Sequence, residues 1–575
     1  MNDAGIEAKL QSRAADTLIN VHLGQYAGAV QSALADADQA NIIRRIWDKD
    51  ASVWKTEPAH QKIITNSLGW LAAAGQMSGK TDELRNFADR IRREGYQHVM
   101  VCGMGGSSLC PEVLRQTFGA NAGYPTLLVL DSTDPDLINN FRNQIDVSRC
   151  LFVIASKSGT TTEPVAFHRY WYGEVSRVSD SPGDSFIAIT DPGTEMASAA
   201  EAEGFKHIFL NQPDLGGRYS ALSHFGMVPA ALLGIDVSKF LQNANAMAEL
   251  CKLPAAQNPA AILGAVMAEC ALAGRNKLTI IADEKLAAVG LWIEQLVAES
   301  TGKEGKGIVP VVLETLGDVS SYGDDRLFVA INLAGGGGGK ALQQLEDANH
   351  PIVYRTLGDI DEVGAEFFLW EMATAFAGWR IGINPFDQPN VQEAKDATKA
   401  LLNSYNKEGR LNEKPALAQS VGLTVYGAGS ANASLADLVR EHVRKAERGD
   451  YIALLAYLEE TAEIDAALTT LRATLRDLTG RAVTLGYGPR YLHSTGQLHK
   501  GGPDSGVFLQ ITAPDHTDFD VPQSAYSFSV LKQAQAQGDL DALLAHGRRA
   551  LRIDLGNDIV AGLRGLEAIL GNDLR

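Results

Sequence analysis

Long apolar runs and positive charge are both scarce in this chain, and each shortage excludes a class of protein. No stretch of 18 uninterrupted apolar residues occurs, so a membrane span is not expected. Residues 1–16 lack the basic start and apolar run of a secretory signal. Acidic residues outnumber basic ones by 69 to 51, for a net charge of −18, which argues against nucleic acid or an anionic membrane as the main partner.

Cysteine is scarce as well. The five cysteines form no CxxC pair and no even framework, so neither a zinc ribbon nor a set of disulfides is indicated. We therefore expect a cytoplasmic protein whose cysteines are reduced thiols: Cys102, Cys110, Cys150, Cys251 and Cys270.

What the chain does contain is an ordinary globular composition, with 45% hydrophobic and 21% charged residues. A chain of 575 residues is too long for one core, so two to four domains are expected. Residues 16–47 carry apolar side chains at three- and four-residue spacing, which predicts an N-terminal helical segment over residues 1–90.

Short apolar runs alternate with helical patterns in two further parts of the chain. The first part, residues 91–235, contains HVMVCGMGG, TLLVLDS, CLFVIASKSG, SFIAITDPG and HIFLN. The second part, residues 236–410, contains KLTIIAD, LFVAINLAG and PIVYRTL. Such alternation is typical of βαβ units, so we predict an α/β protein with two three-layer α/β/α domains and mainly parallel sheets.

Residues 411–575 are predicted to form an α+β region that packs on the functional site. This region has a long helical pattern over residues 434–460 and a conspicuous loop, GYGPRYLHSTGQLHKGGPDSG, over residues 486–506. The loop leads into GVFLQIT, which has the pattern of a strand.

An anion site is indicated where the strand VIA ends in SKSGTT. Ligands of parallel sheets bind beyond the carboxyl ends of the strands, and a helix that begins here would direct N–H groups at one spot. The hydroxyl groups of Ser156, Ser158, Thr160 and Thr161 add donors that suit a phosphate. The alternative is an ordinary Ser/Thr cap and turn. The Walker pattern is absent, so nucleotide hydrolysis with Mg²⁺ is not indicated.

Two glycine-rich stretches need separate interpretations. In CGMGGSSL, Gly105 and Gly106 permit close backbone approach, but Ser108 replaces the third glycine of a dinucleotide fingerprint. Asp131, at the end of LLVLD, is only a weak sign of a ribose-binding acid. The run at residues 335–340 fails the P-loop pattern and is better explained as a loop after a strand.

At this point the motifs identify a resemblance. GMGGSSLCPEV and ASKSGTTTEP are similar to the sugar isomerase (SIS) domain. GGRYSALSHFG (216–226), EQLVAESTGK (294–303) and GINPFDQPNVQEAK (382–395) follow in the order of the phosphoglucose isomerase family. RIWDKDASVWK and GPRYLHSTGQLHKGGP most resemble the isomerase half of fused transaldolase–phosphoglucose isomerase proteins. The resemblance implies two SIS-type domains.

The resemblance implies a glycolytic and gluconeogenic enzyme that interconverts glucose 6-phosphate and fructose 6-phosphate through an enediol. It further implies a hexose 6-phosphate as the ligand, no cofactor, no metal and a homodimer. Two alternatives remain open: an isomerase that also accepts mannose 6-phosphate, and a non-catalytic SIS regulator that only binds phosphosugars.

Site residues carry over at the matching positions. Glu299 matches the proton-transfer base, Arg218 the cation that stabilises the enediolate, and Lys395 the lysine near the ring oxygen. Taken singly, Glu299 could be a solvated helix-end residue and Arg218 a structural ion-pair partner. The residues expected to bind the substrate are Gly106, Ser107, Ser156, Lys157, Ser158, Thr161, Gln295 and Gln388.

One family feature is missing from its usual place. A ring-opening histidine is expected shortly after the glutamate, yet residues 303–335 contain none. YLHSTGQLHKGG, at residues 491–502, resembles the missing segment, so we predict that His493 serves in a rearranged chain. The alternatives are His499, the distant His224 and His350, a histidine of a partner chain, or a loop role for His493. Metal binding by His493 and His499 is not favoured, since no third ligand is clustered with them.

Overall fold

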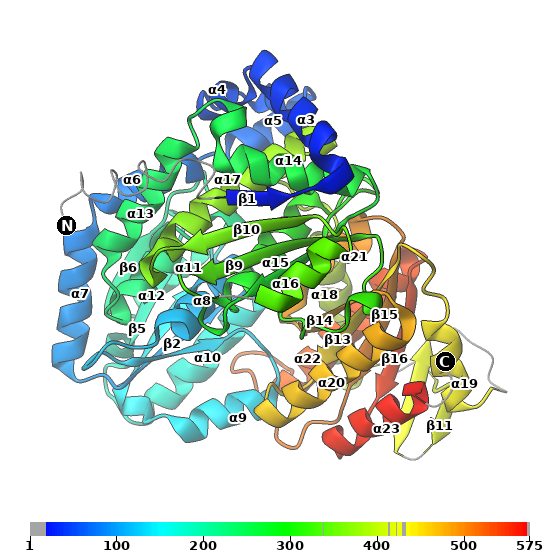
Figure 1. The fold of residues 1–575 in the computed structure, drawn as a ribbon. Helices are drawn as coiled ribbons and strands as arrows, with labels where there is room; N and C mark the ends of the chain where they lie inside the picture. Colours follow the sequence, from blue (N-terminus) through cyan, green and yellow to red (C-terminus); the bar gives the residue numbers. More distant parts are fainter. Residues whose placement is uncertain (1–18, 337–338, 412–414, 421, 428–432, 572–575) are drawn as a thin grey trace.

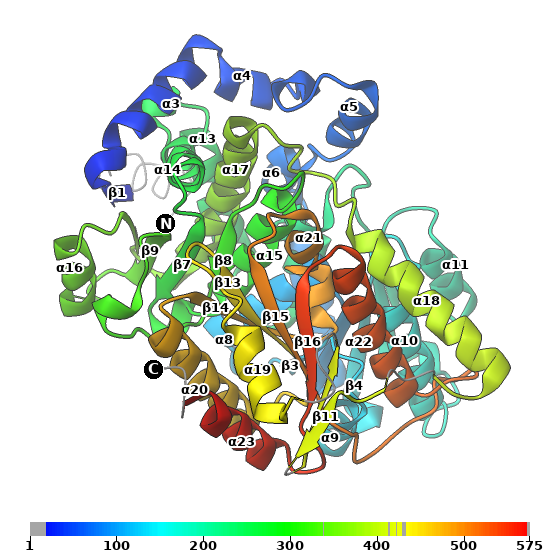
Figure 2. The same ribbon diagram turned by 90° about the vertical axis from the view of Figure 1, so that its right-hand side faces the viewer.

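The chain folds around three separate β-sheets. The structure is a computed structural model, and it describes all residues except 1–18, 337–338, 412–414, 421, 428–432 and 572–575. Each sheet lies between helices, as the α/β prediction requires (Figures 1 and 2). None of the described helices combines the length and the apolar character that crossing a membrane would need.

The first sheet is entirely parallel and has the order β3-β2-β4-β5-β6. All five apolar runs predicted as strands in this part are confirmed: β2 (His98–Gly103), β3 (Thr126–Leu130), β4 (Cys150–Ala155), β5 (Phe186–Thr190) and β6 (His207–Leu210). The helices of this part are α7 (Thr81–Glu94), α8 (Leu109–Phe118), α9 (Pro135–Gln144), α10 (Thr162–Val175), α11 (Glu195–Ala202) and α12 (His224–Leu232).

The second sheet has the order β1-β10-β9-β7-β8 and is parallel except for β1. Its predicted strands are confirmed as β7 (Lys277–Ala282), β9 (Arg326–Leu333) and β10 (Ile352–Leu357), with the short β8 (Val309–Val311) added at one edge. The helices here are α13 (Val237–Leu250), α14 (Pro259–Leu272), α15 (Val289–Thr301), α16 (Gly339–Asp347) and α17 (Val363–Ile381).

The prediction of helix at residues 19–22 is wrong. These residues form β1 (Ile19–His22), which pairs antiparallel with β10 and buries Ile19. Four residues are too few for spacing to separate a strand from the helix that follows, and an available sheet edge decides the outcome. The helices among the other described residues of this segment are α3 (Ala27–Gln39), α4 (Ile42–Trp47), α5 (Pro58–Thr65), α6 (Trp70–Ser78) and most of α7. Part of the glycine run, residues 337–338, lies outside the described residues.

The third sheet has the order β11-β12-β16-β15-β13-β14, and its last four strands are parallel. Its strands are β11 (Ala418–Ser420), β12 (Leu423–Gly427), β13 (Tyr451–Tyr457), β14 (Ala482–Tyr487), β15 (Gly506–Thr512) and β16 (Arg549–Asp554). The helices are α18 (Val391–Glu408), α19 (Leu435–Val443), α20 (Ala462–Thr479), α21 (Gly496–Gly501), α22 (Phe528–Ala545) and α23 (Ile559–Gly571). GVFLQIT is confirmed as the strand β15.

The long helix predicted over residues 434–460 is also wrong. Only α19 is helical there, whereas YIALLAY forms β13, a central strand whose seven residues are all buried. A continuous apolar run has no period, so spacing cannot distinguish a buried helix from a strand with both faces covered.

Pairings between distant segments determine where the site lies. α18 and α22 pack side by side (Figure 2), although more than 100 residues separate them in the chain. We propose a division of the chain at residues 90, 235 and 410, with one sheet centred in each of the ranges 91–235, 236–410 and 411–575. Two elements cross these boundaries: β1, from residues 1–90, joins the sheet of residues 236–410, and α18, from residues 236–410, packs on α22 beside the third sheet.

Candidate active site

All twelve residues predicted for the site line one cavity of about 240 Å³. They come from six segments: the turn after β2, the loop after β4, residues 217–218, α15, residues 388–395 at and just before the start of α18, and the loop after β14. Residues 104–107 and 155–161 lie together because Gly103 and Ala155 are paired at the carboxyl ends of β2 and β4. The lining residues from the prediction are Gly106, Ser107, Ser156, Lys157, Ser158, Thr161, Arg218, Gln295, Glu299, Gln388, Lys395 and His493.

The glycine turn allows three of these segments to touch. Gly105 has φ +54, and a Cβ there would lie 2.7 Å from Nε2 of Gln295 and 2.8 Å from the carbonyl oxygen of His493. A Cβ on Gly106 would lie 1.9 Å from the carbonyl oxygen of Gly217. Both positions therefore require glycine, because a side chain would push α15 and the loop of His493 away from the cavity.

The loop after β4 carries hydroxyl groups that its helix does not use. Thr161 precedes the first residue of α10, yet its side chain makes no capping hydrogen bond. Instead Ser156 Oγ donates to Thr161 Oγ1 at 3.1 Å, and the amide of Gly159 donates to Ser156 Oγ at 3.1 Å. The cap alternative is therefore not what Thr161 does, and its hydroxyl stays at the cavity wall with Ser158.

Lys157 lines the cavity but its charge is already paired. Its Nζ donates to Oδ2 of Asp191 at 2.6 Å and to the carbonyl oxygen of Pro213 at 3.2 Å. Burial raises the pKa of Asp191, and the adjacent Lys157 ammonium opposes that rise. A ligand at this loop would consequently meet hydroxyl and backbone donors before it met a free ammonium group.

Arg218 is 3% exposed and is held by a ring of acceptors. Nε donates to Oγ of Ser300 at 2.8 Å, and Nη2 donates to the carbonyl oxygens of Pro385 and Asp387 at 2.7 and 3.0 Å. These bonds fix the plane of the guanidinium group, so its remaining nitrogen points in one direction.

That nitrogen, Nη1, is shared by the two acceptors at the cavity. It lies 3.2 Å from Oε1 of Glu299 and donates to Oε1 of Gln388 at 3.1 Å. The other carboxylate oxygen of Glu299 accepts from Nε2 of Gln295, one helical turn earlier on α15, at 3.2 Å. A carboxylate is thus placed beside a fixed cation.

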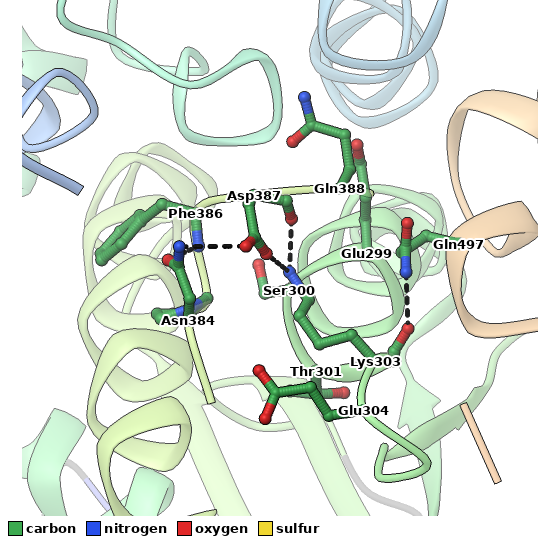
Figure 3. A network of polar contacts seen from close by, with 12 residues as sticks. Glu299, Ser300, Thr301, Lys303, Glu304, Asn384, Phe386, Asp387, Gln388 and Gln497 are labelled. Atoms are coloured by element: carbon green, nitrogen blue, oxygen red, sulfur yellow. Dashed lines mark hydrogen bonds and ion pairs between the residues drawn. The ribbon is translucent and has the colours of Figure 1, made fainter. Parts of the chain in front are cut away.

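A buried lysine holds the segment that carries Gln388. Lys303 is 1% exposed, and its Nζ donates to the carbonyl oxygen of Asp387 and to Oδ1 of the same residue, the latter at 2.8 Å (Figure 3). Burial lowers the pKa of Lys303 to about 8, and the positive charge of Arg218 lowers it further, while Asp387 opposes both. This lysine is the last residue of EQLVAESTGK, and its role was not predicted from that motif.

His493 reaches the cavity beside a buried glutamate. Its Nε2 lies 3.0 Å from Oε1 of Glu163, which also accepts from Nε2 of Gln535 on α22 at 2.7 Å. Burial opposes ionisation of Glu163, but the charge and hydrogen bond of His493, with a smaller effect of Lys395, hold its pKa below the ordinary value. Lys395 itself is exposed on α18 and lines the same cavity.

The loop of His493 is anchored from the first sheet. Asp131, at the end of β3, is 1% exposed and accepts from Nε and Nη2 of Arg490, both at 2.9 Å. This bidentate pair occupies both oxygens of the carboxylate. Asp131 therefore positions a loop and is not free to bind a ribose.

The competing histidines lie elsewhere. His499 is 3% exposed and packs against Tyr491 and Phe508, and burial lowers its pKa well below the ordinary value. His224 and His350 are buried away from the cavity, and neither lines it. Among the residues that the structure describes, His493 is the histidine at this site.

Comparisons with known proteins show what the chain is similar to. Residues 70–316 match the family model for phosphoglucose isomerase. A probable glucose-6-phosphate isomerase of Methanococcus maripaludis is 24% identical over 394 residues, which are 60% of this chain and 88% of that protein. A glucose-6-phosphate isomerase of a Cyanothece species is 27% identical over 425 residues, 64% of this chain and 77% of its own.

Residues 70–316 are therefore similar to the phosphoglucose isomerase family, as are the two relatives.

Solved structures share the fold. The crystal structure of a Chlamydia trachomatis glucose-6-phosphate isomerase aligns with a TM-score of 0.54 at 18% identity and covers 66% of this chain and 86% of its own. A Thermus thermophilus protein described as hypothetical aligns with a TM-score of 0.55 at 23% identity, over 66% of this chain and 99% of its own. About a third of this chain thus lies outside each structural match. The resemblance to fused transaldolase proteins remains a prediction.

Four residues at or beside this cavity were not singled out from the sequence: Glu163, Gln535, Lys303 and Asp387. Glu163 and Lys303 stand inside the motifs ASKSGTTTEP and EQLVAESTGK, so those motifs held a signal that could have identified them. Gln535 carries no such signal, because it belongs to a helix about 370 residues from its partner Glu163.

A buried acid behind the site predicts a pH-dependent stability. Glu294, one residue before Gln295, accepts from Oγ of Ser494 at 3.4 Å. Burial raises its pKa to about 7, against the smaller opposing effects of Arg472, Ser494 and Arg490. Between pH 4.5 and 7 the folded protein therefore holds this proton more tightly than the unfolded chain, so stability falls as pH rises through that interval.

Glu294→Gln is expected to remove this dependence. The unfolding free energy of the variant minus that of wild type should increase by about 3 kcal/mol between pH 4.5 and pH 8. Urea unfolding at several pH values measures it, with the exposed Glu441→Gln on α19 as a control whose difference from wild type stays constant. A constant difference for Glu294→Gln as well would contradict a buried, neutral Glu294.

Proposed function

We propose that this protein interconverts glucose 6-phosphate and fructose 6-phosphate by proton transfer through an enediol, as a step of glycolysis and gluconeogenesis. The observation that carries the proposal is one cavity in which a carboxylate, a fixed guanidinium, a carboxylate-bound histidine and a loop of hydroxyl groups all meet. These are the parts that an aldose–ketose isomerisation needs.

The phosphate is proposed to bind at the loop after β4. Ser156, Ser158 and Thr161 supply hydroxyl groups there, and the N-terminus of α10 supplies backbone N–H groups. Since Lys157 is paired with Asp191, its part in the site is carried by its backbone and its position, and the dianion is held mainly by neutral donors. Gly106 and Ser107 form the adjoining wall against the sugar.

Ring opening is proposed to use His493. Its Nε2 is paired with Glu163, and this contact sets the orientation of the imidazole. Lys395 lines the same cavity and offers a cation for the ring oxygen. The family histidine would thus be supplied from the loop between β14 and β15 of the third sheet instead of from the residues that follow Glu299.

Proton transfer is proposed to use Glu299, which moves a proton between C2 and C1 of the open-chain sugar. Gln295 holds one oxygen of its carboxylate and Arg218 lies at the other. The charge of Arg218 cannot be lost at neutral pH, so it stabilises the negative oxygen of the enediolate as it develops. Gln388, held by Arg218, lines the same cavity and is proposed to contact the substrate.

Further parts of the proposal concern context. We propose that the protein forms a homodimer. We also propose that it is cytoplasmic, which fits the five cysteines, all of them buried and free in the described structure. A non-catalytic phosphosugar regulator is the alternative function, but it would need the hydroxyl loop without Glu299, Arg218 and Lys395 at the same cavity. Acceptance of mannose 6-phosphate stays open, and a direct rate comparison decides it.

The experiment that tests the function follows fructose 6-phosphate formation from glucose 6-phosphate in a coupled assay with chelator present. Wild type is expected to turn over. His493→Ala is expected to be slower by about 100-fold on the ring-closed sugar and close to normal on a sugar phosphate that cannot close its ring. His516→Ala removes an exposed histidine from the same region and should change neither rate.

Two outcomes would contradict parts of the proposal. Equal rates for wild type and His493→Ala on ring-closed sugar would show that ring opening uses another group. Binding of sugar phosphate by wild type without turnover would favour the regulator.

A further inference from the structure

The third sheet has a reversal of strand order at which parallel α/β sheets bind ligands. From β13 the chain passes through α20 to β14 on one side, and from β15 it passes through α22 to β16 on the other side. Connections that leave in opposite directions open a crevice at the carboxyl ends of the two central strands. The family match at residues 70–316 does not extend to this sheet.

A cavity of about 360 Å³ lies at that crevice. Tyr457, Thr512 and Asp554, the last residues of β13, β15 and β16, line it, and α22 closes it with Ala536 and neighbouring residues. It shares no lining residue with the candidate active site, and α22 separates the two. Its volume suits a ligand of drug-like size.

Arg552 lines this cavity with an incomplete set of partners. It projects from β16 on the face covered by α22, and its Nε donates to Oε1 of Gln510 at 2.7 Å. Its Nη2 is buried and has no hydrogen-bond partner in the described part of the chain. Arg552 as a whole is half-buried, so an unmet guanidinium donor there is costly, and a planar oxyanion can pair with a guanidinium through two hydrogen bonds.

The other charged side chains at the cavity already have hydrogen-bond partners. Nζ of Lys532 donates to Oδ2 of Asp134 at 2.9 Å and also to Asp515. The carboxylate of Asp554 accepts from Oγ1 of Thr512 at 2.9 Å and from the amide of Gly556 at 3.0 Å. Of the cations lining the cavity, Arg552 is therefore the one with a donor still to satisfy.

The remaining wall is largely apolar and aromatic. Tyr426 is the cross-strand neighbour of Arg552, and Tyr457 closes the end of β13. Ala513, Pro514 and Leu540 complete the wall. Aromatic and small apolar groups around one cation favour a ligand with a flat ring and a single anionic group.

We infer that the third sheet carries a second binding site, which takes a small aromatic phosphate or carboxylate and pairs its anionic group with Arg552. The site is separate from the proposed isomerase chemistry and does not depend on it.

Calorimetric titration of the full-length protein with phenyl phosphate, benzoate, adenosine monophosphate and inorganic phosphate tests this inference. A ring-bearing anion is expected to bind at micromolar to millimolar concentration, and more tightly than inorganic phosphate. Arg552→Gln is expected to weaken that binding at least about tenfold, because a charged hydrogen-bond pair is lost. Arg552→Lys, which keeps the charge but not the planar fork, should weaken it too.

Two control variants identify the site. Arg564→Gln removes the same charge from the exposed face of α23 and should bind like wild type. Thr161→Val alters the hydroxyl loop of the candidate active site and should also leave this binding intact.

Three results would overturn the inference: no binding of any ring-bearing probe at probe concentrations on the order of 10 mM, unchanged binding in both Arg552 variants, or loss of binding in Thr161→Val. Binding of inorganic phosphate as tight as that of phenyl phosphate would overturn the aromatic part.

Discussion

Glu299→Gln is expected to lower kcat for glucose 6-phosphate isomerisation by roughly 10³-fold, with KM changed only a few-fold. The amide keeps the shape of the side chain and an oxygen facing Nη1 of Arg218, but it cannot accept the proton that moves between C2 and C1. General acid–base catalysis contributes about 10²- to 10⁴-fold, so its loss should dominate all other effects of this substitution. The measurement is steady-state kinetics in both directions of the reaction.

Glu304→Gln is the matched control for that variant. Glu304 lies five residues later and pairs with Lys55 at 2.9 Å near the surface, so its neutralisation should leave kcat within about twofold. A Glu299→Gln enzyme that retains more than a tenth of the wild-type kcat would show that another group accepts the proton. A second check is exchange of the C2 proton with solvent, which should stop in Glu299→Gln while sugar phosphate still binds.

Arg218→Lys is expected to have the second largest effect, a loss of about 10²- to 10³-fold in kcat. A lysine can keep the positive charge but cannot hold Ser300 and the carbonyl oxygen of Pro385 while also facing Glu299. The charge would therefore sit away from the enediolate oxygen. Because these contacts form in a buried site, thermal stability should fall as well, and the two effects need to be separated.

Rates per folded molecule, with a transition-state analogue as a binding probe, separate them. Arg218→Lys should weaken binding of an enediolate mimic such as a hydroxamate far more than binding of fructose 6-phosphate. Gln388→Ala, which removes one of the acceptors of Arg218 without touching its charge, should cost less than tenfold and act mainly on KM. If Arg218→Lys weakened the binding of both ligands equally, Arg218 would be a structural ion-pair partner only.

Local sequence patterns were enough to predict most strands of the first and second sheets. Every apolar run predicted as a strand in residues 91–410 forms one, because each ends at turn-forming residues and lies between clear helices. Local pattern failed at Ile19–His22 and Tyr451–Tyr457. There, short or continuous apolar runs carry no period, and the pairing partner on another strand settled the structure.

The motifs also predicted most of the reactive side chains of the site. The carboxylate, the guanidinium and the hydroxyl loop were expected together, and their residues line one cavity. Roles inside that cavity depend on partners that no motif names. The ammonium of Lys157 is paired with Asp191, a residue 34 positions later, and Gln388 is held in place through Arg218 and the neighbouring contact of Lys303 with Asp387.

By itself, then, the sequence determined the class of fold, the family and the set of reactive side chains, since these depend on residue type and on spacing along the chain. Only the tertiary structure decided which histidine meets the others. His493 stands 194 residues beyond Glu299, and it reaches the cavity because Gly105 lets its backbone approach and Arg490 ties its loop to Asp131. Such contacts depend on packing between three sheets, and packing between distant segments leaves no local pattern in the chain.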